Sequence, residues 1–321
     1  MAKSWKEWES PLIELEASLS KLEQVLKTAT PEQRSELEPK IADFKKRRDN
    51  YITVMYGRLG PWEKVLVARA EKRPYTLDYI QALFTDFIEL DGDRRFGADH
   101  AIVGGPARFE GKSVMVVGHQ KGRNIQERQF RNFAMAKPEG YRKAMRLFDM
   151  ANRFRMPIVT FVDTPAADPG VESESRGISE AIAASMMRMF EVTVPIVSVI
   201  IGEGGSGGAI GIAVANRVLM QEHAVYSVIP PEGCAAILWR MPDKGAQAAA
   251  ALRLTAQSAL EYELIDEIVK EPWGAAHRNP TEAADLVREA LARHLGELGE
   301  PSVALKAERY TKFRKMGIFE G

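Results

Sequence analysis

Glycine is concentrated in one short stretch of this chain, and that stretch limits what the surrounding residues can form. The β-branched run Ile196–Ile201 is followed by five glycines among residues 202–208, and then by the small apolar segment Ala209–Ala215. This pattern predicts a buried strand, a turn of bare backbone and a tightly packed helix over Ala209–Ala215. Because glycine has no Cβ, backbone N–H groups in such a turn can closely approach a ligand, and the dipole of the next helix favours negative charge there.

The same glycines fit two known motifs that depend on side chains. Residues 202–207 have the form G-x-G-x-x-G with Glu222 about 20 residues later, as in dinucleotide-binding folds, although several strands are expected before this one. Residues 204–208 have the form G-x-S-x-G, which places Ser206 as a hydrolase nucleophile followed by histidines in chain order. Those histidines are His223, His277 and His294.

A third interpretation needs no side-chain nucleophile. The backbone N–H groups of Gly207 and Gly208 would stabilise an oxyanion, while Gly204 and Gly205 shape the turn. A simpler alternative is that these glycines only allow a helix to pack closely on the sheet. A phosphate-binding P-loop is excluded, because no Lys-Ser or Lys-Thr follows the glycines.

A second loop is expected beside the glycine turn. Residues 163–170, Asp-Thr-Pro-Ala-Ala-Asp-Pro-Gly, follow the predicted strand Pro157–Val162. Ligands of open α/β sheets bind at the carboxyl ends of the strands, where both segments lie. We therefore expect Ala166 and Ala167 to form a wall of the same pocket, although such a loop is also an ordinary turn.

The rest of the chain alternates between segments with the hydrophobic pattern of a helix and segments with that of a strand. Residues 5–57 predict an antiparallel helical hairpin, with Thr30 and Gln33 as a capping box. Two strands joined at Glu110-Gly111 come next, and strands and helices then alternate. The pattern indicates an α/β fold with a mostly parallel sheet, and Thr281–Leu295 is expected to be the final helix.

Composition excludes several classes of function. Lys+Arg and Asp+Glu both number 44, which gives no electrostatic basis for binding nucleic acid or a membrane surface. The single cysteine, Cys234, excludes a disulfide or a cysteine-cluster zinc site within the chain. With no apolar run of about 18 residues and no signal-peptide pattern, we expect a cytoplasmic protein.

Many blocks along the chain, in order, are those of one family. The chain resembles the α subunit of the bacterial multi-subunit acetyl-CoA carboxylase carboxyltransferase. The matching blocks include RPYTLDYI at 73–80, GDRRFGADHAIVGG at 92–105, VVGHQKGR at 116–123, MPIVTFVDTP at 156–165, IGEGGSGGAIGIA at 201–213, YSVIPPEGCAAILW at 226–239 and AHRNP at 276–280. The sequence departs from the family pattern at Ala166, Asp168 and Pro230, where glycine, tyrosine and serine are usual.

The resemblance implies a crotonase-like fold of ββα turns over residues 73–321, preceded by a helical extension over residues 1–72. It implies transfer of the carboxyl group of carboxybiotin, borne on a separate biotin carrier protein, to acetyl-CoA, giving malonyl-CoA for fatty acid synthesis. The implied partners are a β subunit in an α2β2 assembly, which carries the zinc and most of the acetyl-CoA site, and a biotin carboxylase, which consumes the ATP. Gly207 and Gly208 would then hold the ureido oxygen of biotin, with Gly204, Gly205, Ala166 and Ala167 around it.

Overall fold

A mostly parallel sheet forms the centre of the molecule. The computed structural model describes residues 5–317, in which the sheet has the strand order β1-β2-β3-β4-β5-β7, and β6 pairs with the far end of β4. Only β1 and β2 are antiparallel. The strands are β1 (Ile102–Phe109), β2 (Lys112–His119), β3 (Ile158–Thr164), β4 (Ile196–Gly205), β5 (Arg217–Gln221), β6 (Val225–Ser227) and β7 (Glu267–Val269).

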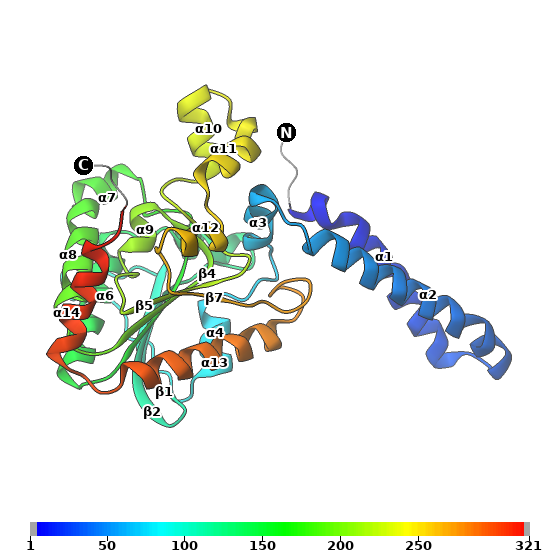
Figure 1. The fold of residues 1–321 in the computed structure, drawn as a ribbon, viewed down its shortest axis with the longest axis horizontal. Coiled ribbons are helices and arrows are strands. Elements are labelled where there is room, and N and C mark those ends of the chain that lie inside the picture. The colour runs from blue at the N-terminus through cyan, green and yellow to red at the C-terminus, as the bar shows by residue number, and fades with distance from the viewer. Residues whose placement is uncertain (1–4, 318–321) are drawn as a thin grey trace.

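Helices cover both faces of this sheet (Figure 1). On one face Ala144, Leu147 and Ile200 belong to one buried apolar cluster, and on the other Tyr79 and Phe161 belong to a second. The longer helices are α1 (Trp5–Thr28), α2 (Pro31–Tyr56), α3 (Pro61–Ala68), α4 (Thr76–Leu83), α6 (Pro138–Arg153), α8 (Ile178–Glu191), α10 (Pro231–Trp239), α11 (Gly245–Leu252), α13 (Pro280–Leu298) and α14 (Val303–Arg314). The short helices are α5 (Ile125–Phe130), α7 (Val171–Ser175), α9 (Ser206–Ile210) and α12 (Ala256–Glu261), with 3-10 turns at Asn132–Ala134 and Pro242–Lys244.

The structure confirms the α/β class and corrects two elements. Strand β4 does not end at Ile201 but continues to Gly205, because residues 203–205 pair with β6. The helix expected over Ala209–Ala215 is wrong, since α9 spans only Ser206–Ile210. The helix expected to end the chain is followed by α14, which packs beside α8.

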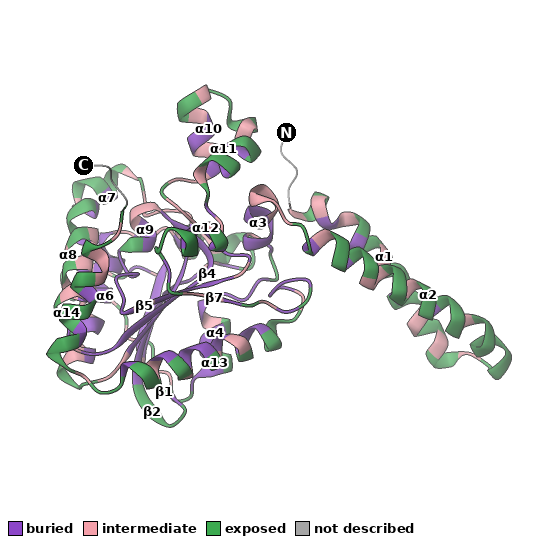
Figure 2. Ribbon diagram, in the orientation of Figure 1, coloured by how far each residue is buried: buried purple, intermediate pink, exposed green. Residues whose placement is uncertain are grey.

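The N-terminal hairpin projects from the body and is largely exposed (Figures 1 and 2). Its turn has the predicted capping box, in which the Gln33 N–H donates to Thr30 Oγ1 and the Thr30 N–H donates to Gln33 Oε1 over 3.0 Å. At its base, Glu9 Oε1 accepts hydrogen bonds from Tyr56 over 2.6 Å and from Arg278 over 2.8 Å. This polar contact anchors the hairpin to the loop before α13.

Helix α3 packs on both the hairpin and the body, and its Val67 shares a buried cluster with Leu12 and Ile52 of the hairpin. Val65 and Ala68 of α3 share a buried cluster with Val225, Ala249 and Leu254. The predicted boundary between a helical extension over residues 1–72 and a domain over residues 73–321 therefore stays a prediction. Across residues 5–317, none of the helices has the length and apolar character needed to span a bilayer.

Helix α14 is held by one buried guanidinium. Arg309 is fully buried and donates to the carbonyl oxygens of Val192 and Val194 over 2.9 and 3.0 Å. It also donates to Asn216 Oδ1 over 2.7 Å. The last helix therefore satisfies the backbone that leads into β4.

Candidate functional site

The glycine turn and the loop after β3 are in direct contact. A Cβ on Gly205 would lie 1.9 Å from the carbonyl oxygen of Pro165, and one on Gly208 would lie 2.5 Å from the carbonyl carbon of Ala166. Neither position can accept a side chain without movement of backbone. The two segments that the sequence placed at the carboxyl ends of β3 and β4 therefore form one unit. Ala166 and Ala167 contact Gly208 but are not among the residues that line the two pockets beside the turn, so their role as a pocket wall stays a prediction.

Part of the glycine requirement is packing, as the simpler interpretation predicted. A Cβ on Gly204 would meet the Tyr226 ring at 2.8 Å, whereas one on Gly207 would meet only the end of the Ile182 side chain at 3.3 Å. Gly207 is thus the glycine with the most room around it in this turn. The backbone reverses direction at Ser206, which has a left-handed φ of 52°.

The amides of Gly207 and Gly208 lie in the first turn of α9. First-turn N–H groups have no acceptor within their own helix. Gly205, the residue before α9, gives no side-chain cap to them. The carbonyl oxygens of both glycines are already used, since Gly207 accepts from the Gly211 N–H over 3.1 Å and Gly208 accepts from the Tyr141 hydroxyl over 3.3 Å. The Gly207 carbonyl lies in the same peptide plane as the Gly208 N–H, so its hydrogen bond to Gly211 fixes the direction of the Gly208 amide.

An apolar cavity of about 470 Å³ opens beside the first turn of α9. Ser206, Gly207 and Ile210 line it from α9. Most of the opposite wall is apolar, and Arg253 is the one charged side chain that residues 5–317 contribute to it. That wall includes Met186, Tyr226, Leu252, Leu264, Phe313 and Met316. Of the five glycines among residues 202–208, Gly207 is the one that lines this cavity.

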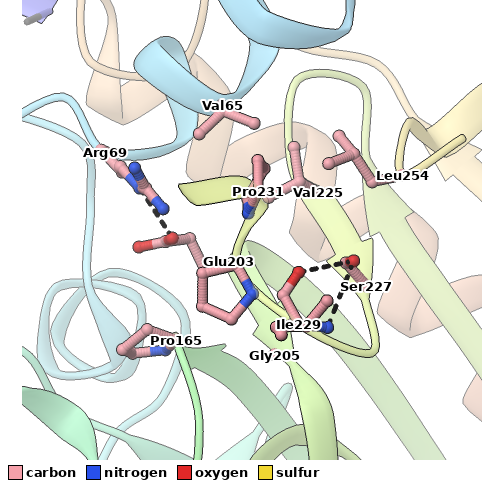
Figure 3. A pocket seen from close by; sticks show the side chains of 12 residues that line it. Val65, Arg69, Pro165, Glu203, Gly205, Val225, Ser227, Ile229, Pro231 and Leu254 are labelled. Atoms are coloured by element: carbon pink, nitrogen blue, oxygen red, sulfur yellow. Dashed lines mark hydrogen bonds and ion pairs between the residues drawn. The ribbon is translucent and has the colours of Figure 1, made fainter. Parts of the chain in front are cut away.

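A smaller hollow lies on the other side of the turn (Figure 3). Pro165, Gly204 and Gly205 form part of it, and Ser227 belongs to both this hollow and the apolar cavity. On its charged side, the Arg69 Nε donates to Glu203 Oε2 over 2.8 Å, as Figure 3 shows. This hollow is also lined mostly by apolar residues, but unlike the apolar cavity it contains an ion pair.

Glu203 belongs to a set of ionic side chains that we call the strand-end cluster: Arg69, Lys121, Asp163, Glu203 and Glu232. Lys121 Nζ lies 2.7 Å from Asp163 Oδ1 and 3.1 Å from Glu203 Oε1. Burial opposes ionisation of Glu203, but the charges of Lys121 and Arg69 outweigh it and lower its pKa to about 2. Burial likewise opposes the Lys121 ammonium, but Asp163 and Glu203 raise its pKa. Burial raises the pKa of Asp163 even beside Lys121. Glu203 and Lys121 are therefore both ionised at neutral pH.

Sequence reasoning missed the strand-end cluster. Its partners lie far apart in the chain, with 82 positions between Lys121 and Glu203. One signal was available: Asp163 and Glu203 interrupt runs that are otherwise apolar or glycine, and buried carboxylates are almost always paired.

The departures from the family pattern are accommodated locally. Ala166 is not among the residues with positive φ, so its Cβ adds no backbone strain. The Asp168 carboxylate accepts a hydrogen bond from the Ser173 hydroxyl of α7, and the Asp168 N–H donates to the Ala136 carbonyl over 3.0 Å. Asp168 is therefore engaged with its own loop.

The residues of the two side-chain motifs are not brought together. Of the histidines after Ser206, His277 lies 3.1 Å from the Tyr56 hydroxyl, at the base of the hairpin, and His294 lies 2.7 Å from Glu267. His223 lies near the buried Arg73–Glu271 pair. None of the three hydrogen-bonds to Ser206 within residues 5–317. For a dinucleotide motif, residues 202–205 would need to form a loop, yet they are part of β4.

Solved structures with this architecture include carboxyltransferases and a decarboxylase. The chain matches a Pseudomonas malonate decarboxylase hetero-tetramer in complex with coenzyme A at a TM-score of 0.58 and 17% identity, over 76% of this chain and 97% of that chain. It matches transcarboxylase 12S with methylmalonyl-coenzyme A bound at a TM-score of 0.56 and 21% identity, over 70% of this chain and 42% of that chain. The fold is therefore the crotonase-like fold of carboxyltransferases, as predicted.

The sequence comparisons define the family more closely. A family described as acetyl co-enzyme A carboxylase carboxyltransferase-like matches residues 5–317. The acetyl-coenzyme A carboxylase carboxyl transferase subunit alpha of Geobacter metallireducens is 54% identical, over 98% of this chain and 97% of the relative. The protein of the same name in Thermus thermophilus is 51% identical, over 98% of each chain. The chain belongs to the acetyl-CoA carboxylase carboxyltransferase family.

Proposed function

We propose that this chain is the α subunit of an acetyl-CoA carboxylase carboxyltransferase. With a β subunit it would transfer the carboxyl group of carboxybiotin to acetyl-CoA and form malonyl-CoA. The observation that carries the proposal is the first turn of α9: two adjacent glycine amides in a rigid turn, one of them lining an apolar cavity. The sequence supports the same proposal, because the chain is 54% and 51% identical to two α subunits over nearly its whole length.

The chemistry needs a site for developing negative charge. Loss of the carboxyl group from carboxybiotin leaves charge on the ureido oxygen, and the N–H groups of Gly207 and Gly208 would donate to that oxygen. One such donor contributes about 2.7–4 kcal/mol to catalysis in other enzymes. The adjacent apolar cavity suits the hydrocarbon part of the ligand, and a low-polarity wall strengthens the two hydrogen bonds.

The partners follow from the same assignment. The second oxyanion site, for the thioester of acetyl-CoA, would be provided by the β subunit, along with the zinc. The carboxyl donor would arrive on a biotin carrier protein, loaded by a biotin carboxylase that consumes ATP. A cytoplasmic location is proposed with them. Within residues 5–317, no three metal-ligating side chains gather as a metal site would need.

Reconstitution tests this function. Purified β subunit and carboxybiotin should convert acetyl-CoA to malonyl-CoA only when this chain is added. If β subunit alone forms malonyl-CoA at the same rate, the chain is a scaffold and the proposal fails.

A pair of substitutions at Ser206 separates carboxyl transfer from a serine hydrolase. Ser206→Gly removes the hydroxyl and suits the left-handed backbone, whereas Ser206→Ala removes the hydroxyl but keeps a Cβ at φ 52°. Both variants should retain carboxyl transfer, with Ser206→Ala losing more stability. Abolished transfer in Ser206→Gly would point instead to a role for the hydroxyl.

A further inference from the structure

A buried ammonium joins the ends of the two strands that carry the site. Lys121 follows β2, Asp163 lies next to the last residue of β3, and Glu203 lies two residues before the end of β4. The Asp163 side chain is 1% exposed, and the Lys121 and Glu203 side chains are 15% and 11% exposed. Three neighbouring strands of the sheet therefore meet at one cation.

The two carboxylates lie within one hydrogen-bond network. Asp163 Oδ1 accepts from both Lys121 Nζ and the Glu203 N–H, the latter over 2.9 Å. A Cβ on Gly202 would lie 2.3 Å from the same oxygen, so the carboxylate fills the space between the strands. Like charges this close disfavour each other's ionisation unless a cation lies with them.

The surrounding groups do not replace Lys121. The titratable side chains that face the cluster are His119 in β2, Arg69 after α3, Arg73 and Tyr75 before α4, Tyr79 in α4 and Arg128 in α5. Arg69 pairs with Glu203 and Glu232, and Arg73 pairs with Glu271. Within residues 5–317, the only ion pair of Asp163 is with Lys121.

The cluster is linked mechanically to the proposed oxyanion site. Two residues beyond Asp163, Pro165 contacts Gly205, and Ala166 contacts Gly208. If Asp163 and Glu203 moved apart, these contacts would open and the Gly207 and Gly208 amides would shift with them. A misplacement of about 1 Å costs about 100-fold in rate in other enzymes.

We propose that Lys121 is a positioning residue for carboxyl transfer. Its ammonium holds Asp163 and Glu203 side by side and so fixes the spacing between the Pro165–Ala167 loop and the turn at Gly205–Gly208. The inference rests on the proposed function, because rate is one of its two readouts. The second readout, amide hydrogen exchange over residues 163–169 and 203–209, is independent of that function.

The test uses Lys121→Met, which keeps the length of the side chain and removes its charge. Assembled with the β subunit, this variant should lose about 100-fold in kcat at pH 8. Its kcat should rise as the pH falls toward 6, because a protonated Asp163 no longer repels Glu203. Wild-type protein should lack this rise, and hydrogen exchange in the two segments should be faster in the variant.

The double variant Lys121→Met with Asp163→Asn provides the matched control. Asparagine keeps the oxygen that accepts from the Glu203 N–H and removes the charge that Lys121 compensated. The double variant should recover at least part of the rate, lose the pH dependence and regain slow exchange. If Lys121→Met alone fails to fold, the rate and hydrogen exchange of the double variant still test the inference.

Two results would overturn the inference. One is a folded Lys121→Met complex with wild-type kcat, pH profile and exchange. The other is a folded double variant whose exchange stays faster than wild type. If the wild-type complex itself forms no malonyl-CoA, the proposed function fails, while the exchange comparison still decides the role of Lys121.

Discussion

The two sides of the glycine turn differ in the charged groups that they contain. On the Gly207 side lies an open cavity with mainly apolar walls, whereas on the Glu203 side ionic side chains fill the space and pair with one another. The difference indicates a division of labour. Paired ionic side chains join the strand ends on one side, while on the other side Gly207 lines a cavity that we propose receives the ligand.

The largest effect is expected where the turn meets the neighbouring loop. Gly208→Val should reduce carboxyl transfer by at least about 100-fold, because the new side chain would collide with the Ala166 backbone and displace the amides. The measurement is kcat for malonyl-CoA formation, with circular dichroism to show that the fold is present.

Gly207→Ala is the matched control for Gly208→Val. Its Cβ would approach only the end of the Ile182 side chain, and the backbone N–H remains. It should retain most of the rate. If kcat falls equally in Gly207→Ala and Gly208→Val, contact with the Ala166 backbone is not the cause of the loss.

On the ionic side, Glu203→Gln should change how stability depends on pH. The pKa of Glu203 is about 2 when folded and 4.5 for the reference group, so its ionised form stabilises the folded protein above pH 4.5. That contribution is about 3 kcal/mol and is lost as the pH falls from 4.5 toward 2. Urea unfolding should show the variant to be weaker at pH 7, with the difference shrinking at pH 3.

Glu300→Gln, at an exposed position, controls for the loss of a charge and should unfold like wild type at both pH values. A constant difference between wild type and Glu203→Gln from pH 7 to pH 3 would contradict the assigned ion pairs.

On the apolar side, Ile210→Ser should weaken binding of the biotinyl donor with little change in kcat. Ile210 is 38% exposed and lines the cavity. Losing about 1 kcal/mol of apolar contact should raise the KM for the donor about five-fold. Val303→Ser, at a position 73% exposed and outside the cavity, should leave KM unchanged. A KM that does not respond to Ile210→Ser would remove the cavity from the ligand path.

The smallest effect on activity is expected at a glycine that lies away from the glycine turn. A Cβ on Gly296 in α13 would meet nothing within 4 Å. Gly296→Ala should therefore stabilise the protein by up to about 1 kcal/mol and leave transfer unchanged. A higher Tm with normal kcat would show that removing a glycine harms activity only where backbone is crowded.

The sequence predicted helices and strands well where residues close in the chain determine the backbone conformation. The two strands around Glu110-Gly111 could be predicted because a glycine between two apolar runs is typical of a tight turn, and Gly111 has a positive φ of 78°. The end of β4 was misjudged, because pairing with β6 keeps glycines 204 and 205 extended, and no local pattern reveals a partner strand. Helix α14 was missed for a similar reason, since its anchor is the buried Arg309 rather than a strong apolar face.

The site divides in the same way. The contact between the glycine turn and the Ala166–Ala167 loop could be predicted, because small residues after two buried strands are a local sequence pattern. The strand-end cluster has no such pattern, since Lys121, Asp163 and Glu203 are ordinary charged residues until the sheet aligns the ends of their strands. Composition can thus locate a turn, but the pairing of distant charges needs the three-dimensional fold.

The buried guanidinium of Arg309 has a consequence for biosynthesis. Translation proceeds from the amino end, so the hairpin of α1 and α2 is complete long before residue 309 emerges. Until then the carbonyl oxygens of Val192 and Val194 lack the donor that satisfies them in the finished protein. Nascent chains halted before α14 should consequently remain open to proteases around residues 189–194.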